Sequence, residues 1–142
     1  MLKEKIEGRI RSVAKVTDWK EAIQLAAQAL VEDGSVETSY IKAMIENVNK
    51  FGSYIIIAPK VAMPHARPED GVNKNGISLL RVQEGVSFEE EGEKVYLFFV
   101  LGAVSSDSHI ETLMALMDLI EDEEKIEKIV EAKDTEEMLM YI

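Results

Sequence analysis

The stretch IIIAPKVAMPHARPEDG, residues 55–71, predicts how the middle of the chain folds. It contains two apolar segments, residues 55–57 and 61–63, and a proline closely follows each of them. Proline fixes its own φ angle and favours extended geometry in the residue before it. We therefore expect two short extended segments, with His65 held at the edge of the hydrophobic core immediately after Pro64.

The chain has few side chains that can carry nucleophilic or proton-transfer chemistry near neutral pH. It contains two histidines, His65 and His109, and no cysteine. Because imidazole titrates near neutral pH and can act as a nucleophile, such chemistry would rest mainly on these two residues. The alternative for His65 is a histidine that is only hydrogen-bonded at a strand end, and the alternative for His109 is an inert surface histidine.

The sequence around His65 resembles a known family. Residues 57–66, which end in VAMPHA, resemble the active-site segment of the type 2 (mannitol/fructose-like) enzyme IIA proteins. These proteins belong to the bacterial phosphoenolpyruvate-dependent sugar phosphotransferase system. Residues 51–72, FGSYIIIAPKVAMPHARPEDGV, are closer still to the ascorbate-specific branch. The resemblance runs from the helix that begins at Trp19 to the chain end, and the PHARPE core is its most specific part.

The resemblance implies a phosphoryl carrier. It implies that His65 accepts a phosphoryl group from the phosphohistidine of the carrier protein HPr and passes it to a cysteine of the cognate IIB protein. L-ascorbate is then the expected transported compound, and His109 is a second active-site histidine at a helix start. No cofactor or metal is expected, because the protein mainly positions the phosphoryl group and offsets its charge.

The sequence near His109 has the pattern of a helix N-terminus. Ser108 and Glu111 match a capping box, which predicts Ser108 as the N-cap and His109 as the first helical residue. There the positive end of the helix dipole favours a neutral imidazole, which could donate a hydrogen bond to a phosphoryl oxygen. We expect His65 and His109 to face each other across one shallow depression, with His65 partly exposed.

Positive charge near the phosphoryl group is expected from Arg67. At about 4 Å and an effective dielectric constant of about 20, one such charge offers roughly 4 kcal/mol before desolvation. Mannitol-type members carry an arginine on the helix before the strand, where this chain has Asn49 beside Lys50. Arg67 or Lys50 could therefore fill that role. The alternative for Arg67 is an exposed arginine paired with Glu69 or Asp70.

Composition and charge indicate which partners the chain can bind and in which cellular compartment it works. The 142 residues are 46% hydrophobic and 30% charged, as is usual for globular proteins, and no apolar run approaches the roughly 20 residues that cross a bilayer. The formal net charge of −11 disfavours nucleic acid and anionic membranes and favours a basic protein surface. We expect residues 1–142 to form one cytoplasmic domain. The sequence does not determine its oligomeric state.

The order of helices, strands and helices predicts an α/β (α+β) sandwich with a mixed sheet flanked by helices. The resemblance implies the same fold. Hydrophobic spacing predicts the individual elements, with Asp18 and Asp134 as expected N-caps and Gly34 as an expected helix stop. Helices are expected at residues 2–11, 19–33, 38–50, 109–121, 123–132 and 135–142, and strands at residues 54–58, 77–82 and 95–101.

Three of these expectations concern position and burial. The unbroken apolar run at residues 54–58 is typical of a strand that is buried on both faces. Residues 95–101 are the most hydrophobic segment and are expected to form a central strand. On the helix that follows His109, helical spacing predicts a buried face made of Ile110, Leu113, Met114, Met117 and Ile120 or Glu121.

Two other classes of function compete with the phosphoryl carrier. A regulatory module could be phosphorylated on the same fold and control a partner instead of feeding transport. Transfer of phosphate to a cysteine-bearing IIB protein would separate these two readings. A metal hydrolase is disfavoured, because the two histidines lie far apart in sequence and form no metal-binding spacing.

Overall fold

A five-stranded mixed sheet runs through the computed structural model, which describes residues 2–105, 107 and 109–142. The strand order is β1-β4-β5-β3-β2. The antiparallel pairs are β4 with β5 and β2 with β3, whereas β1 runs parallel to β4 and β3 runs parallel to β5. The strands are β1 (Ile10–Val13), β2 (Ile56–Ala58), β3 (Val61–Ala62), β4 (Gly76–Ser87) and β5 (Lys94–Gly102).

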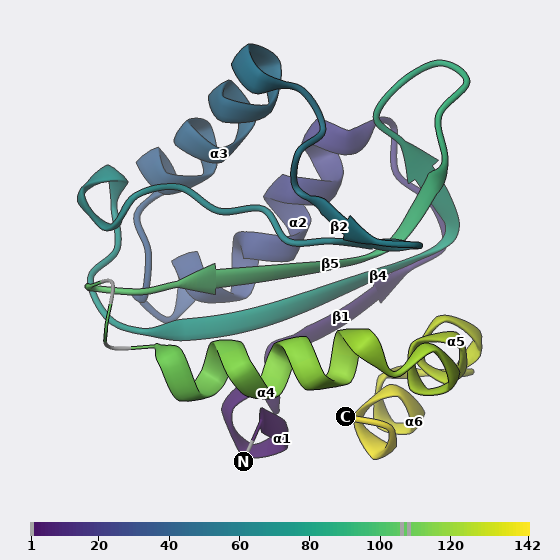
Figure 1. Ribbon diagram of the computed structural model, residues 1–142. Coiled ribbons are helices and arrows are strands. Elements are labelled where there is room, and N and C mark those ends of the chain that lie inside the picture. The colour runs from purple at the N-terminus through teal and green to yellow at the C-terminus, as the bar shows by residue number, and fades with distance from the viewer. Residues whose placement is uncertain (1, 106, 108) are drawn as a thin grey trace.

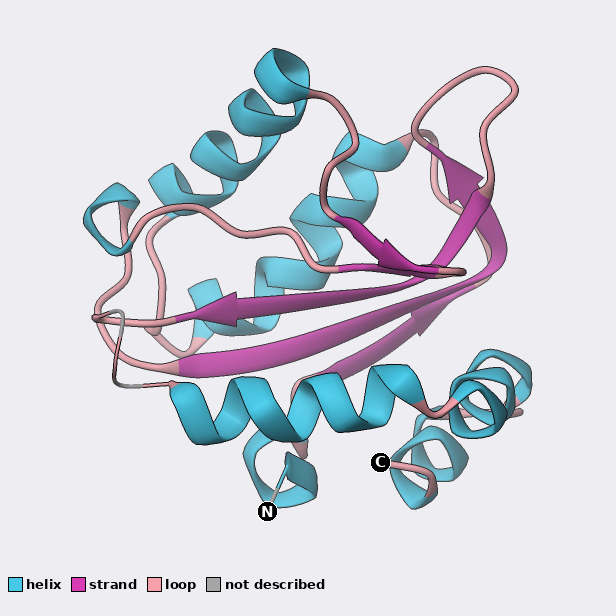
Figure 2. Ribbon diagram, viewed as in Figure 1, coloured by secondary structure: helices cyan, strands magenta, loops and turns pink. Residues whose placement is uncertain are grey.

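Helices cover both faces of the sheet (Figure 1), which confirms the predicted fold class. On one face lie α2 (Trp19–Glu32) and α3 (Thr38–Phe51). The other face is covered by α1 (Leu2–Ile6), α4 (Ile110–Glu121), α5 (Glu123–Glu131) and α6 (Thr135–Met140), as Figure 2 shows. A short 3-10 helix, η1 (Pro68–Asp70), follows β3. In the part of the chain that the structure describes, no helix is both long and apolar enough to cross a membrane.

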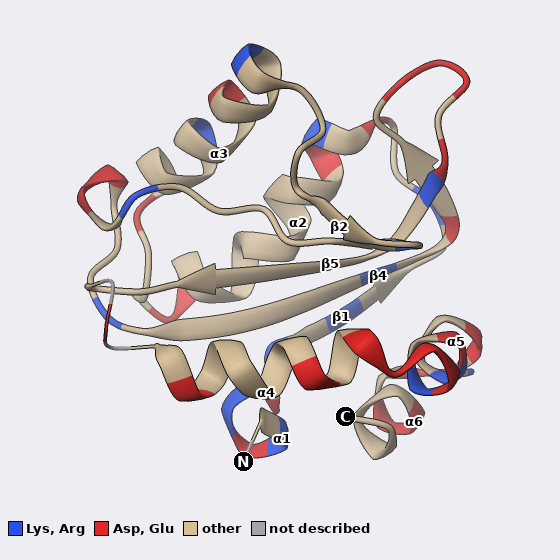
Figure 3. Ribbon diagram, viewed as in Figure 1, with Lys and Arg blue, Asp and Glu red and all other residues tan. Residues whose placement is uncertain are grey.

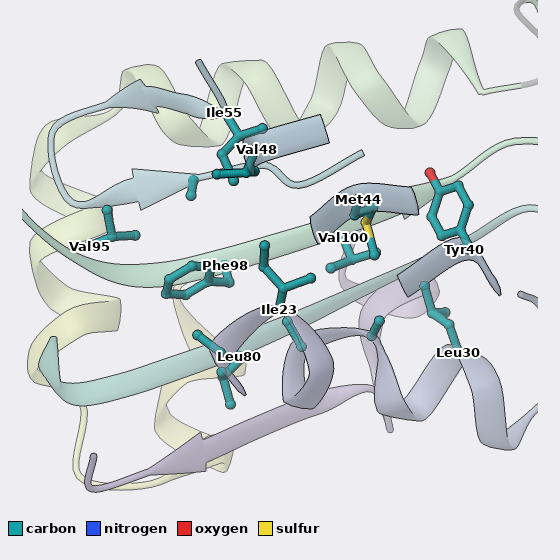
Figure 4. Packing of buried hydrophobic residues seen from close by; sticks show 14 of the residues in the cluster. Ile23, Leu30, Tyr40, Met44, Val48, Ile55, Leu80, Val95, Phe98 and Val100 are labelled. Carbon is teal, nitrogen blue, oxygen red and sulfur yellow. The ribbon is translucent and has the colours of Figure 1, made fainter. Parts of the chain in front are cut away.

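The sheet separates two hydrophobic clusters, because successive side chains of a strand point to opposite faces. On β5, which lies in the middle of the sheet as predicted, Phe98 packs into the cluster under α2 and α3. Leu97 and Phe99 pack into the cluster under α4 and α5. Figure 4 shows part of the first cluster, in which Phe98 lies near Ile23 and Leu80.

Local capping signals in the sequence are confirmed at several helix ends. Asp18 Oδ1 accepts a hydrogen bond from the Glu21 amide at 2.9 Å, which caps α2. Asp134 Oδ1 accepts from the Glu137 amide at 2.9 Å in the same way at the start of α6. Gly34 follows the end of α2 with a φ of +81°, a left-handed conformation that glycine adopts without strain.

The expected helix over residues 2–11 is wrong in its second half. Helix α1 ends at Ile6, and Gly8 turns the chain with a φ of +83°. The following residues form β1, in which Ile10 pairs with Leu79 of β4. A short isolated helix is only marginally stable, so pairing with a distant strand decides the conformation of this segment.

The expectation that residues 54–58 are buried on both faces is also wrong. Within this run the strand β2 covers Ile56–Ala58, and it lies at one edge of the sheet. Ile57 is 39% exposed there, whereas Ile55, just before the strand, is 1% exposed. An apolar run cannot distinguish an edge strand from a central one, because that difference depends on which strands pair.

The predicted buried face of α4 is only partly correct: Ile120 is buried and Leu113 and Met117 pack against the core, but Ile110 and Met114 do not. The structure buries Thr112, Leu116, Leu119 and Ile120, whereas Ile110 is 49% and Met114 is 63% exposed. Apolar residues surround most of this helix, so their spacing fits more than one buried face.

The buried side chain of Arg81 connects β4, in the middle of the sheet, with β1 and with the C-terminal end of α5 through hydrogen bonds. Arg81 on β4 is 1% exposed, and its Nε and Nη2 donate to Ser12 Oγ at 3.0 and 2.9 Å. Its Nη1 donates to the carbonyl oxygens of Ile129 and Val130 at 3.2 and 3.0 Å, and also to that of Ala132. These carbonyls lie at the C-terminal end of α5, where carbonyls lack partners within the helix and positive charge is stabilising.

Replacing this arginine is expected to destabilise the protein strongly. Arg81→Met keeps an apolar side chain of similar length but leaves the buried carbonyls and the Ser12 hydroxyl without their donor. We expect the free energy of unfolding in urea to fall by about 3 kcal/mol or more. Arg11→Met, at an exposed position of β1, should change it by less than about 0.5 kcal/mol. Equal stabilities of the two variants would contradict this role of Arg81.

Candidate active site

His65 lies in the loop that follows β3, and a backbone carbonyl fixes its tautomer. Its Nδ1 is 2.9 Å from the carbonyl oxygen of Met63. Because a carbonyl oxygen can only accept a hydrogen bond, Nδ1 carries the proton and the lone pair of the neutral ring is on Nε2. The side chain is half-buried, which confirms the expectation that it is partly exposed. Its Nε2 therefore has the electronic form of a nucleophile.

A buried hydroxyl attaches the loop of His65 to the sheet. Tyr40 of α3 is 1% exposed, and its hydroxyl donates to the carbonyl oxygen of Leu101 at 3.0 Å. The same oxygen accepts a hydrogen bond from the amide of Ala66 at 3.2 Å. Figure 4 shows Tyr40 beside Met44 of the same helix, close to β5. Through this one side chain, α3 holds the residue after His65 against the end of β5.

An aromatic side chain that the sequence analysis did not single out packs against His65. The ring centroids of Tyr54 and His65 are 5.5 Å apart, and the rings meet edge to face at 89°. Partial burial raises the pKa of Tyr54, and a hydrogen bond with the Asn47 side chain acts in the opposite direction. Tyr54 also meets Phe51 edge to face at 6.3 Å. The imidazole therefore rests against a ring that is itself held from α3.

No periodic signal in the sequence marks Tyr54 as part of a site. It stands between the end of α3 and β2, where an aromatic residue fits a strand prediction equally well. The available cue is exposure, because Phe51 is 62% and Tyr54 is 42% exposed. Exposed neighbouring aromatic side chains are more often part of a binding surface than of a core. That cue appears only in the folded chain.

Arg67, the expected source of positive charge, lies on the surface. Its side chain is 74% exposed, with Nε 3.5 Å from Glu69 Oε1 and Nη2 3.5 Å from Asp70 Oδ1. Exposed ion pairs of this length are weak, so they do not lock the guanidinium in place. Asn49 and Lys50 are also exposed, and the Lys50 ammonium lies 5.3 Å from the centroid of the Phe51 ring.

His109 lies at the start of α4, one position earlier in the helix than predicted. The helix begins at Ile110, and His109 is its N-cap residue; the predicted N-cap, Ser108, lies outside the described residues. His109 Nδ1 is 3.2 Å from the carbonyl oxygen of Ser105, so Nδ1 is the donor there. A neutral His109 in this tautomer can only accept at Nε2. Donation from Nε2 to a phosphoryl oxygen therefore requires the doubly protonated ring.

The segments that carry the two histidines meet the same end of β5. The Tyr40 hydroxyl joins Ala66, next to His65, to the carbonyl of Leu101. Leu101 in turn lines a cavity together with His109. The two histidines thus approach the end of one central strand, and their direct contact across a shared depression stays a prediction.

The arrangement around His65 suits nucleophilic group transfer without a metal. A half-exposed imidazole with a fixed proton on one nitrogen can attack with the other and be regenerated in the same tautomer. In residues 2–105, 107 and 109–142, no group of three or more His, Asp or Glu side chains is placed to hold a metal ion.

Comparison with known proteins shows the same fold and family over nearly the whole chain. Residues 7–142 match the family model described as phosphoenolpyruvate-dependent sugar phosphotransferase system, EIIA 2. The ascorbate-specific PTS system EIIA component of Escherichia coli is 35% identical over 135 residues, which are 94% of this chain and 88% of that protein.

Two solved structures from Escherichia coli extend this similarity. The mannitol-specific cryptic phosphotransferase enzyme IIA superposes with a TM-score of 0.91 at 35% identity, covering 99% of this chain and 96% of that one. The mannitol enzyme IIA in complex with phosphorylated IIB superposes with a TM-score of 0.80 at 28% identity, covering 95% and 94%. The chain therefore belongs to the EIIA 2 family of the phosphoenolpyruvate-dependent sugar phosphotransferase system, whose members are cytoplasmic phosphotransferases that work through a phosphohistidine.

Proposed function

We propose that this chain acts as one unit that carries a phosphoryl group on His65, from HPr to a cysteine of a IIB protein. The observation that carries the proposal is the distance of 2.9 Å between His65 Nδ1 and the Met63 carbonyl oxygen. It leaves Nε2 as the nucleophilic nitrogen of a half-exposed ring. The family provides the phosphohistidine chemistry, and the geometry favours His65 as its site.

Both transfers use the same nitrogen. In the first, the lone pair of His65 Nε2 attacks phosphorus; the bond between phosphorus and the HPr imidazole breaks, and its electron pair returns to that imidazole. In the second, a thiolate of IIB attacks phosphorus, and the electron pair of the breaking bond returns to Nε2. Nδ1 keeps its proton and donates it in a hydrogen bond to the Met63 carbonyl oxygen, which stabilises the positive charge that develops on the ring.

We assign the stabilisation of phosphoryl charge to Arg67 and His109. The exposed guanidinium of Arg67 can exchange its two weak ion pairs for a bond to a phosphoryl oxygen, since both pairs are 3.5 Å long. His109 donates from Nε2 when its ring is doubly protonated, because Nδ1 is directed at the Ser105 carbonyl. Lys50, at the end of α3, is the alternative source of charge.

The proposed partners fit the charge of the chain and the relatives. The solved mannitol complex is formed between an enzyme IIA that is 28% identical to this chain and a phosphorylated IIB. The formal net charge of −11 favours a basic rim on the partner, and such steering weakens as salt is added. Tyr54, which contacts His65, and Phe51, which contacts Tyr54, are both exposed and supply apolar area for a transient contact.

We further propose that the relay serves L-ascorbate uptake. Residues 51–72 support this, because they resemble the ascorbate branch most closely. Overall identity does not discriminate, since the ascorbate-specific relative and the mannitol-specific cryptic structure are each 35% identical to this chain.

Substitution of the proposed nucleophile tests the proposal. With phosphoenolpyruvate, enzyme I and HPr, we expect His65→Ala to take up no acid-labile phosphate, because the attacking nitrogen is gone. His109→Ala should still be labelled on His65, but about 100-fold more slowly, since one charge-stabilising donor is lost. Peptide mapping of the labelled proteins checks both results. Label on the His65→Ala protein would contradict the proposal.

The ring of Tyr54 is expected to orient His65. Tyr54→Phe keeps the edge-to-face contact and should transfer phosphate within about threefold of the wild-type rate. Tyr54→Leu removes the ring and should slow single-turnover transfer from phosphorylated HPr by about tenfold. The melting temperatures of both variants control for unfolding. If Tyr54→Leu transfers as fast as Tyr54→Phe, the ring does not position His65.

A panel of acceptors tests the partner and the substrate together. The phosphorylated protein is mixed with purified IIB proteins of the ascorbate and mannitol types, and loss of label from His65 is timed. We expect the ascorbate-type IIB to be phosphorylated faster, and a variant that lacks its cysteine to accept nothing. Faster transfer to the mannitol-type IIB would overturn the ascorbate assignment, and transfer to neither would favour a regulatory role.

A further inference from the structure

A cavity of about 220 Å³ opens between α1, the first residues of β4 and the first turn of α4. Three of the side chains that line it carry or can carry positive charge: Lys5, Arg9 and His109. Ile77 and Leu101 provide apolar surface, and Thr112 of α4 provides a hydroxyl. His65 is not one of its lining residues, so this cavity is distinct from the proposed nucleophile.

The lining of this cavity is basic, although the whole chain has a formal net charge of −11. The short helix α1, which lies beside α4, carries Lys3 and Lys5 and also Glu4, and Figure 3 shows residues of both charges on it. Lys5 Nζ donates to Thr112 Oγ1 at 2.8 Å, and Arg9 Nη1 donates to the Lys5 carbonyl oxygen at 2.9 Å. Asp33 Oδ2 accepts from Arg9 Nε at 2.7 Å and offsets the charge of Arg9. The charge of Lys5, which is bonded to a neutral hydroxyl, is therefore available to an anion.

The cavity also lies at the N-terminal end of a helix of 12 residues, α4. Helix N-termini favour anions, and phosphate groups in particular, because their first amides and the helix dipole face the ligand. Here that end is combined with a lysine, an arginine and a histidine around one partly open cavity. Its volume is below the roughly 300 Å³ at which pockets for drug-sized ligands begin, so it suits a small compound.

We propose that this cavity binds a small phosphate monoester. The phosphate lies between the ammonium of Lys5 and the first turn of α4, and the carbon skeleton rests on Ile77 and Leu101. Because His109 lines the same space, an occupied cavity changes the surroundings of the proposed charge-stabilising residue. The proposal concerns binding at this cavity and stands whether or not His65 is the phosphorylated residue.

Titration by ¹H–¹⁵N NMR at constant ionic strength tests the proposal on the whole chain. The probes are glycerol 3-phosphate, inorganic phosphate and glycerol. We expect saturable shifts of the Ile77, Leu101 and Thr112 amides with both anions but not with glycerol, and tighter binding of the ester. Affinity for inorganic phosphate equal to or above that for the ester would overturn the assignment to a monoester. Absence of saturation at millimolar ligand, or saturable shifts confined to the loop of His65, would overturn the site.

Charge reversal on α1 provides the matched control. Lys5→Glu should weaken the binding of glycerol 3-phosphate by about tenfold or more, because it replaces a positively charged donor by a carboxylate that repels the phosphate. Lys3→Glu makes the same change of charge at an exposed position of the same helix that does not line the cavity, and should change affinity by less than about twofold. Lys5→Gln, which keeps a donor for Thr112, separates loss of charge from loss of local structure and should also weaken binding. Equal effects of Lys5→Glu and Lys3→Glu would show that only the overall charge matters.

Discussion

The hydroxyl of Tyr40 is the interaction on which the geometry of the active-site loop depends. Strand β3 has only two residues, so the sheet itself holds the loop of His65 over a very short distance. Beyond it, the Ala66 amide and the Leu101 carbonyl both bond to the one hydroxyl. Leaving a buried polar group without a partner costs about 1–3 kcal/mol, so this pairing favours one position of the loop. The position of His65 is thus linked to α3, a helix that contributes no nucleophile.

The reactive form of His65 follows from the backbone. Pro64 is buried and has a restricted φ angle, and the carbonyl of Met63 receives the Nδ1 proton at 2.9 Å. A carrier has to accept and release the same group, so it benefits from a nucleophile that returns to its starting state. A backbone carbonyl serves this need, because, unlike a carboxylate, it does not take up the Nδ1 proton of the ring. The edge-to-face contact with Tyr54 then limits rotation of the imidazole.

Sequence reasoning succeeded where a local pattern decides the structure and failed where distant contacts decide it. The caps at Asp18 and Asp134, the central strand β5 and the mixed sheet follow from capping chemistry and hydrophobic runs. Strand β1 depends on pairing with β4, and the buried face of α4 depends on packing of a helix that is apolar nearly all round. The sequence motif pointed to His65, but the roles of Tyr40 and Tyr54 arise from contacts that no spacing reveals.

The central claim is that the Met63 carbonyl holds the proton on Nδ1, so that Nε2 of His65 carries the phosphoryl group. Long-range ¹H–¹⁵N NMR of the protein before and after phosphorylation through HPr tests it most directly, with ³¹P coupling to identify the bonded nitrogen. The account predicts a proton on Nδ1 in both states and phosphorus bonded to Nε2. A proton on Nε2 in the free protein, or phosphorus bonded to Nδ1, would contradict it.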